Sequence, residues 1–124
     1  MLYVDDDRVN SLLFSETCRV AGNVELEIAD TGAEAQELVQ HWRPDMLVID
    51  LHLPDTDGYA LLPVLRELLR RPELPAFLCT ADAERDVAGP AEEAGFSGCW
   101  SKPLAVDSLK QALSEVAQAG RAAA

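Results

Sequence analysis

Short runs of apolar residues alternate along this chain with longer segments whose apolar residues recur at helical spacing. Each run is apolar at nearly every position, which is typical of a strand buried on both faces of a parallel sheet. Strands that alternate with helices predict an α/β fold of three layers, a doubly wound five-stranded parallel sheet between two layers of helices. The predicted strands are Leu2–Val4, Val24–Ala29, Met46–Asp50, Ala76–Cys79 and Gly98–Ser101.

Four of the helical segments carry an apolar stripe that we expect to face the core. Asp7 is expected to cap the first helix or simply to be exposed, rather than to bind a metal, and Thr31 and Glu34 form a capping box that starts the second. Gly89-Pro90 interrupts another segment, so that helix either begins late, with Pro90 in its first turn, or is kinked. The stripes are Val9, Leu12, Leu13 and Val20; Ala35, Leu38, Val39 and Trp42; Leu61, Leu62, Leu65, Leu68 and Leu69; and Val106, Leu109, Leu113 and Val116.

The composition restricts the partners and the compartment. With 22 acidic and 10 basic residues the formal charge is −12, which disfavours binding to nucleic acids or anionic membranes. No apolar run approaches the roughly 20 residues of a membrane span, and no signal peptide precedes the first strand. Cys18, Cys79 and Cys99 lack paired spacing and are expected to be buried, reduced thiols of a cytoplasmic protein. We expect a single domain over residues 1–118 and an Ala-rich tail, 119–124.

Acidic residues mark the ends of two predicted strands. Asp5 and Asp6 follow the first strand directly, and Asp50 ends the third. Three carboxylates at one edge of a parallel sheet would repel one another unless a hard cation such as Mg²⁺ neutralised them. Thr80 and Lys102 come at the ends of the fourth and fifth strands, at the same edge. A nucleophilic carboxylate, a cation and groups that hold phosphoryl oxygens together indicate phosphoryl transfer.

On these motifs the chain resembles the receiver domains of two-component response regulators, over essentially its whole length. The resemblance implies a flavodoxin-like fold with strand order 2-1-3-4-5. It also implies either a stand-alone regulator or a receiver from a hybrid histidine kinase. The matching residues are Val4-Asp5-Asp6, Asp50 to Pro54 followed by Asp57-Gly58, Thr80-Ala81 and Ser101-Lys102-Pro103.

The resemblance assigns the metal and the acceptor. Asp50 would accept the phosphoryl group, and Asp5, Asp6 and Asp50 would hold Mg²⁺ together with the backbone carbonyl of His52. The donor would be a histidine kinase, a histidine phosphotransfer protein or a small phosphodonor. The domain would catalyse its own phosphorylation and dephosphorylation rather than turn over an external substrate. We hypothesise that His52 and Asp82 tune the lifetime of the phospho-aspartate.

Two further residues are expected to respond to phosphorylation. Thr80 would bind a phosphoryl oxygen, and Lys102 would form an ion pair with the phosphate on Asp50. The peptide between Lys102 and Pro103 is expected to be cis, which X-Pro bonds permit at modest cost. Drawing Thr80 and Lys102 inward would shift the domain between two surface conformations.

The sequence departs from the family on the face that many receivers use for output. Cys99 stands three residues before Lys102, where many receivers have an aromatic switch residue. Trp100 should point to the opposite face of its strand, toward the core, so it is no obvious replacement. Together with Gly89-Pro90, this predicts intact phosphorylation with a non-standard output to an unknown partner, or to a second copy in a homodimer.

The sequence leaves two other functions open. The chain is compatible with a pseudo-receiver, a protein-interaction module that works without phosphorylation, because the switch position is altered. A haloacid-dehalogenase-type phosphohydrolase also uses an aspartyl nucleophile, but it requires a second Asp two residues later. His52 occupies that place, and no substrate-capping insertion is visible.

Overall fold

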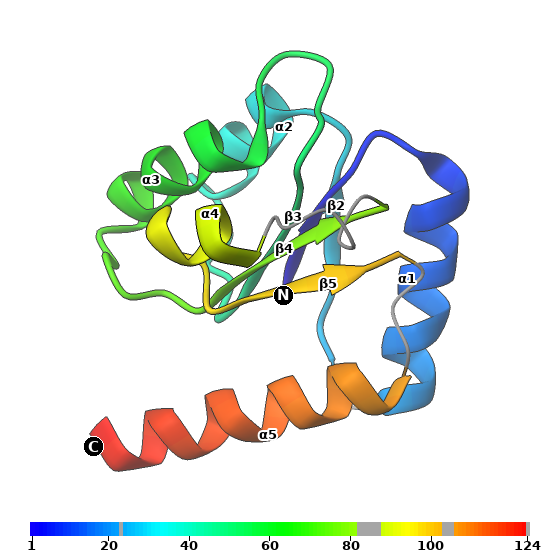
Figure 1. The fold of residues 1–124 in the computed structure, drawn as a ribbon, viewed down its shortest axis with the longest axis vertical. Helices are drawn as coiled ribbons and strands as arrows, with labels where there is room; N and C mark the ends of the chain where they lie inside the picture. The colour runs from blue at the N-terminus through cyan, green and yellow to red at the C-terminus, as the bar shows by residue number, and fades with distance from the viewer. Residues whose placement is uncertain (23, 82–87, 103–105, 124) are drawn as a thin grey trace.

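The computed structural model describes residues 1–22, 24–81, 88–102 and 106–123, and Figure 1 shows their arrangement. Strands and helices alternate without exception over these residues. The elements are β1 (Leu2–Val4), α1 (Arg8–Ala21), β2 (Glu27–Ala29), α2 (Gly32–Leu38), β3 (Leu47–Asp50), α3 (Gly58–Leu69), β4 (Ala76–Thr80), α4 (Ala88–Glu93), β5 (Gly98–Ser101) and α5 (Val106–Ala123).

The five strands form one parallel sheet in the order β2-β1-β3-β4-β5, which confirms the predicted doubly wound fold and its strand order. Three boundaries differ from the sequence-based expectation. β2 begins at Glu27 rather than at Val24, β3 begins at Leu47 rather than at Met46, and β4 continues to Thr80. Among the described residues, no helix is both long enough and apolar enough to cross a bilayer.

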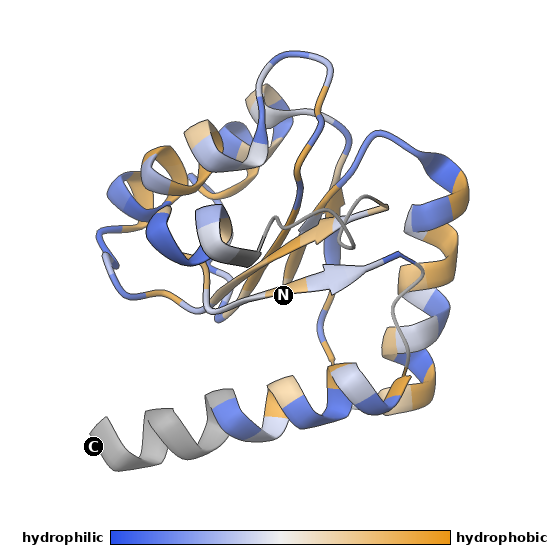
Figure 2. Cartoon of the chain, in the orientation of Figure 1, coloured by the Kyte–Doolittle hydropathy of each residue, from blue (hydrophilic) through white to orange (hydrophobic). Residues whose placement is uncertain are grey.

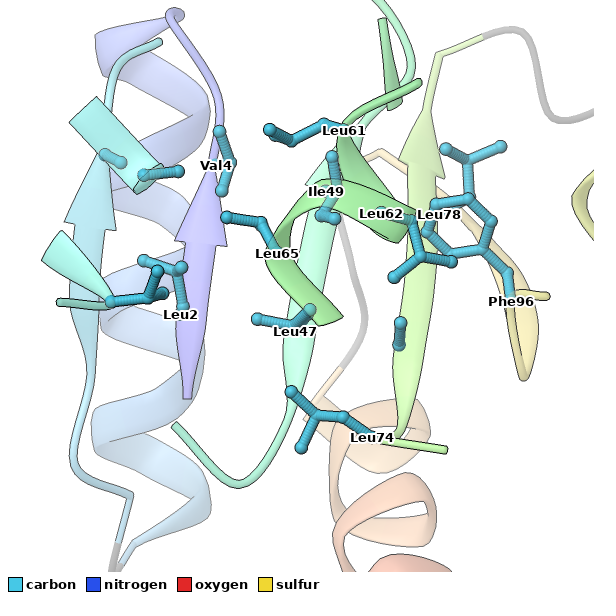
Figure 3. Close-up of a cluster of buried hydrophobic side chains, with 14 of the residues drawn as sticks. Leu2, Val4, Leu47, Ile49, Leu61, Leu62, Leu65, Leu74, Leu78 and Phe96 are labelled. Carbon is cyan, nitrogen blue, oxygen red and sulfur yellow. The ribbon is translucent and has the colours of Figure 1, made fainter. Parts of the chain in front are cut away.

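Two hydrophobic clusters, one on each face of the sheet, hold the layers together. The first packs against α2, α3 and α4, and Figure 3 shows its central side chains, among them Val4, Ile49 and Leu65. The second lies under α1 and α5 and includes Tyr3, Phe14 and others. Successive strand residues alternate between the clusters, because neighbouring side chains on a strand point to opposite faces. β1 therefore has both faces buried, which explains its continuously apolar sequence.

The orientation of α1 contradicts the prediction from its apolar stripe. Val9 is 65% exposed and Leu12 is 71% exposed, and both belong to the stripe that was expected to face the core. The buried face instead holds Ser11, Phe14 and Cys18, on the opposite side of the helix. Phe14 decides the orientation, because its ring stacks on Tyr3 of β1 with centroids 4.1 Å apart. Leu13 and Val20 of the same stripe are also exposed.

The other stripes face the core with one further exception. Leu68 of α3 is 42% exposed, whereas the remaining leucines of its stripe are buried. α3 stays helical through Pro63, and Pro90 lies in the first turn of α4, as predicted for a late-starting helix. α5 continues through most of the Ala-rich tail to Ala123. Nothing is described of the side chain of Val116.

The predicted helix caps are present. The Asp7 carboxylate accepts hydrogen bonds from the N–H groups of Val9 and Asn10, and so begins α1. The Thr31 hydroxyl accepts from the Glu34 N–H at the start of α2, while the Glu34 carboxylate accepts from the N–H of Asp30. Each cap satisfies backbone donors that the first turn of a helix leaves without partners.

The three thiols are free, as predicted, but they differ in burial. Cys18 and Cys79 are buried and Cys99 is half-buried. Burial raises the pKa of Cys18 to about 11 and, as the largest influence, the pKa of Cys79 to about 12. Both therefore stay protonated at neutral pH and behave as small apolar core residues.

Candidate functional site

The three acidic residues meet at the carboxyl edge of the sheet, as their places at the strand ends predicted. Asp5 follows β1, Asp50 ends β3, and one carboxylate oxygen from each of Asp5, Asp6 and Asp50 lies within 4.8 Å of the others. Asp5 has no exposed surface and Asp50 is buried, whereas Asp6 is exposed. An all-carboxylate set of this size suits a hard divalent cation such as Mg²⁺ better than a metal that prefers nitrogen or sulfur ligands.

Lys102 supplies the positive charge of this site. Its Nζ lies 2.8 Å from Oδ2 of Asp5 and 3.1 Å from Oδ1 of Asp50, and its side chain is only 11% exposed. Burial alone would lower the pKa of Lys102, but its hydrogen bond to Asp5 and the charge of Asp50 outweigh burial and raise it. The ammonium therefore stays charged and joins the two buried carboxylates.

The carboxyl group of Asp50 is less acidic than an ordinary aspartate. Burial is the largest influence and raises its pKa, and the charge of Asp5 acts in the same direction. Lys102 and a hydrogen bond donated by the backbone N–H of His52 oppose this effect without cancelling it. The ionised form of Asp50 is thus destabilised in the folded protein. A cation bound at the cluster in addition to the Lys102 ammonium would reduce this free-energy cost.

Tyr3 contacts the site from beneath, a role that sequence reasoning missed. Its hydroxyl donates a 2.7 Å hydrogen bond to Oδ2 of Asp5, the same oxygen that accepts from Lys102. Burial, together with this hydrogen bond, raises the pKa of Tyr3, so the hydroxyl keeps its proton and acts as a donor. The sequence contained one signal for this contact: Tyr3 and Asp5 are two residues apart, and residues i and i+2 of a strand share a face.

Hydrogen bonds fix the loop between β3 and α3 to the first turns of α2 and α3. The Asp55 carboxylate accepts hydrogen bonds from the N–H groups of Gly32 and Ala33 at the start of α2, each 2.9 Å long. The Asp57 carboxylate caps α3. A Cβ on Gly58 would lie 2.9 Å from the carbonyl oxygen of Asp50. The close approach requires glycine there. The anchor at Asp55 was not foreseen.

The acidic cluster opens into a cleft of about 580 Å³. His52, two residues after Asp50, is exposed and lines the cleft, as does Leu13 of α1. Thr80 ends β4 at the same edge but is only 1% exposed and is not part of the cleft wall. Asp82 and Pro103 lie outside the described residues. The other residues that line the cleft are Asp5, Asp6, Asp7, Asn10, Asp50, Leu53, Pro54, Ala81 and Lys102.

The two residues near the expected switch position point to opposite faces of the sheet. Cys99 packs against the cluster under α3 and α4, while Trp100 stacks on Phe77 in the cluster under α1 and α5. The ring centroids of Trp100 and Phe77 are 4.3 Å apart. Trp100 is therefore turned toward the core on the other face, as predicted, and does not replace the missing aromatic residue at Cys99.

Comparison with known protein families identifies the family of the chain that carries this site. The family model of the response regulator receiver domain matches residues 1–114. The chain is a response regulator receiver domain. The receiver is 31% identical over 118 residues to the sensor protein EvgS of Escherichia coli, covering 95% of this chain and 10% of EvgS. It is 30% identical to the chemotaxis protein CheY of Pseudomonas aeruginosa over 94% of either chain.

The receiver thus spans about a tenth of the length of the sensor proteins that it matches. Among solved structures, a receiver domain from Clostridium thermocellum superposes with a TM-score of 0.84, covering 99% of this chain and 97% of the other. The sequence identity of that pair is 18%, so this likeness supports the fold alone. The five-stranded sheet and its helices are those of the CheY-like, flavodoxin-like fold.

Proposed function

We propose that this receiver accepts a phosphoryl group on Asp50 in an Mg²⁺-dependent reaction and converts it into a conformational signal. The observation that carries the proposal is the position of Asp50 at the cleft, beside Asp5 and Asp6 and in contact with Lys102. The membership of the receiver family supports the same reaction. The proposed receiver domain covers residues 1–118, with the tail 119–124 outside it.

The carboxylates of Asp5, Asp6 and Asp50 would hold Mg²⁺, and the backbone carbonyl of His52 is the proposed further ligand. When bound, Mg²⁺ neutralises negative charge on the acceptor and on the phosphoryl oxygens. These ligands fit Mg²⁺ because every side-chain ligand is a carboxylate oxygen, and because among the described residues a single ammonium, that of Lys102, contacts the two buried carboxylates.

Asp50 is the nucleophile of the proposed reaction. One of its carboxylate oxygens attacks the phosphorus of the donor, a new O–P bond forms, and the bond from phosphorus to the leaving group breaks with its electron pair. Lys102 would then exchange its contact with Asp50 for one with the phosphoryl oxygens, and Thr80 would turn toward them. The modified side chain carries roughly two negative charges, which favours both movements.

The signal is proposed to leave through a non-standard output face. Cys99 is half-buried against the cluster under α4 and has no ring that could swing inward, so the response must come from other parts of that face. Pro90 in the first turn of α4 also sets the start of that helix. The recipient is an unknown output protein or a second copy of the chain.

The proposed phosphodonors are a histidine kinase, a histidine phosphotransfer protein or a small phosphodonor, in the cytoplasm. The exposed apolar stripe of α1 supports a protein donor, because it runs along the helix whose Leu13 lines the cleft. Figure 2 shows hydrophobic residues along much of α1. A receiver within a hybrid sensor kinase agrees with the match to EvgS, and a stand-alone receiver agrees with the match to CheY.

Incubation with acetyl phosphate and Mg²⁺ should add one phosphoryl group to the protein, as seen by intact-protein mass. The same incubation with excess chelator should leave the mass unchanged, because the acceptor and donor charges are then not neutralised. A folded protein that acquires no adduct from any donor would contradict the proposal and favour a phosphorylation-independent pseudo-receiver.

Leu12→Ser should separate the two kinds of donor. Because Leu12 is 71% exposed, we expect a change in unfolding free energy of no more than about 0.5 kcal/mol and an unchanged rate with acetyl phosphate. Transfer from a phosphorylated histidine phosphotransfer protein should slow about tenfold, the loss of about 1.4 kcal/mol of docking energy. Leu68→Ser, at the exposed leucine of α3, is the control. Equal rates for both variants would argue against docking on α1.

A further inference from the structure

Tyr3 contacts Asp5 of the acidic cluster, yet it lies outside the motifs that carry the resemblance to receiver domains. We propose that Tyr3 is a positioning residue for the divalent-cation site, holding Asp5 in place and remaining its partner when Lys102 turns to the phosphoryl group. The inference rests on the proposed function, because it concerns the same cation site. The geometry that carries it is the 2.7 Å hydrogen bond from the Tyr3 hydroxyl to Oδ2 of Asp5.

Asp5 depends on these donors because it has no exposed surface. Its Oδ1 accepts a 3.0 Å hydrogen bond from the N–H of Asp7, and its Oδ2 accepts from both Tyr3 and Lys102. Water cannot replace a donor at a carboxylate that is fully buried, so each lost hydrogen bond leaves an acceptor unsatisfied. The N–H of Asp7 and the hydroxyl of Tyr3 therefore fix the orientation of the Asp5 carboxylate.

Lys102 is a shared and movable partner, whereas Tyr3 is not. Lys102 also contacts Asp50 at 3.1 Å, so its ammonium is divided between two carboxylates. If it moves toward a phosphoryl group on Asp50, Oδ2 of Asp5 keeps the hydrogen bond from the Tyr3 hydroxyl. Tyr3 thus matters most in the cation-bound and phosphorylated states, where the orientation of Asp5 has to be maintained.

Packing holds the ring of Tyr3 in place, so its hydroxyl cannot turn toward another hydrogen-bond acceptor. It is 1% exposed, and it stacks on Phe14 with an angle of 3° between the ring planes. β1 lies between β2 and β3, so the backbone of Tyr3 is paired on both sides. A donor fixed by packing and by a central strand is the kind of support that keeps a metal ligand in one orientation.

Tyr3→Phe removes the hydroxyl and keeps the ring, so we expect it to fold and to bind Mg²⁺ about tenfold more weakly in isothermal titration calorimetry. The gain in melting temperature on adding Mg²⁺ should shrink accordingly. Tyr59→Phe is the matched control, since Tyr59 is the other tyrosine of the chain and packs against Phe96, away from the cluster. Its Mg²⁺ affinity should stay within about twofold of the wild type, as expected for an independent site.

A double-mutant comparison separates positioning from a general loss of structure. In a Lys102→Met background, the Tyr3 hydroxyl is the one donor left to Oδ2 of Asp5 among the residues that the structure describes, so removing that hydroxyl should weaken Mg²⁺ binding by a larger factor than in the wild type. An equal factor in both backgrounds, or a wild-type affinity in folded Tyr3→Phe, would overturn the role of Tyr3. A wild-type protein that binds no Mg²⁺ would overturn the proposed cation site itself.

Discussion

Asp50→Asn is expected to lose the phosphoryl adduct completely, in intact-protein mass spectra recorded with acetyl phosphate and Mg²⁺. A neutral amide is a poor nucleophile, and the substitution also removes one of the three carboxylates that would hold the cation. The two effects act in the same direction. Asp45→Asn is a suitable control, because Asp45 is exposed and lies just before the opposite end of the same strand. A persistent adduct in Asp50→Asn would place the acceptor elsewhere.

The same substitution should make the metal-free protein more stable at neutral pH. The pKa of Asp50 is raised in the folded state, mainly by burial, so the folded protein binds its proton more tightly than the unfolded chain does. Stability therefore falls as pH rises through the raised pKa, and above it the charged Asp50 is a net cost. Asparagine does not titrate. The gain should be present at pH 7 and should disappear below the ordinary aspartate range, as measured by urea denaturation across pH.

Those two effects distinguish a functional residue from a structural one. Replacing a residue selected only for packing would lower the stability of the protein. Replacing Asp50 is instead expected to abolish its activity and to raise its stability. Such an exchange is common where a buried charge is kept for chemistry. The gain at pH 7 would be absent if Lys102 compensated Asp50 fully, and that result would show that the contact at 3.1 Å outweighs burial.

Most of the acidic site could be predicted because strand ends in a parallel sheet converge on one edge. The apolar runs located β1 and β3, and the acids that follow them then had to lie together. No side-chain detail was needed for that step. The contacts of Lys102 with both Asp5 and Asp50 follow from the same convergence, since Lys102 comes directly after β5.

The orientation of α1 could not be predicted in the same way. Its sequence offers two faces that could be buried, one with Val9 and Leu12 and one with Phe14 and Cys18. Periodicity finds faces but does not choose between them. The choice was made by a tertiary contact, the stacking of Phe14 on Tyr3, which only the packed structure contains. The more apolar face was left exposed beside the cleft.

Tyr3 was missed for a related reason. In an apolar strand a tyrosine is read as a core residue, and Tyr3 is indeed part of the core cluster under α1. Its hydrogen bond to Asp5 depends on the direction of its hydroxyl and on the burial of Asp5, and the amino-acid sequence shows neither. The same limit applies to Asp55, whose hydrogen bonds reach a helix more than twenty residues away in the chain.

Lys102→Met is expected to destabilise the metal-free protein by about 3 kcal/mol, the usual cost of removing one partner from a buried ion pair. Methionine fills a similar volume but leaves Asp5 and Asp50 without their shared cation. The loss should shrink as pH falls, because Lys102 normally lowers the pKa of Asp50 and its removal lets the folded state take up a proton more readily. Urea denaturation at several pH values measures both effects.

Mg²⁺ should restore more stability to Lys102→Met than it adds to the wild type, because the cation would replace the lost ammonium between the carboxylates. Lys110→Met is the matched control, since Lys110 is the other lysine of the chain and is exposed on α5. It should leave both stability and the response to Mg²⁺ unchanged. A loss in Lys102→Met that ignored both pH and Mg²⁺ would mean that Lys102 acts through packing. Charge neutralisation would then not be what allows two buried carboxylates to lie together at this edge of the sheet.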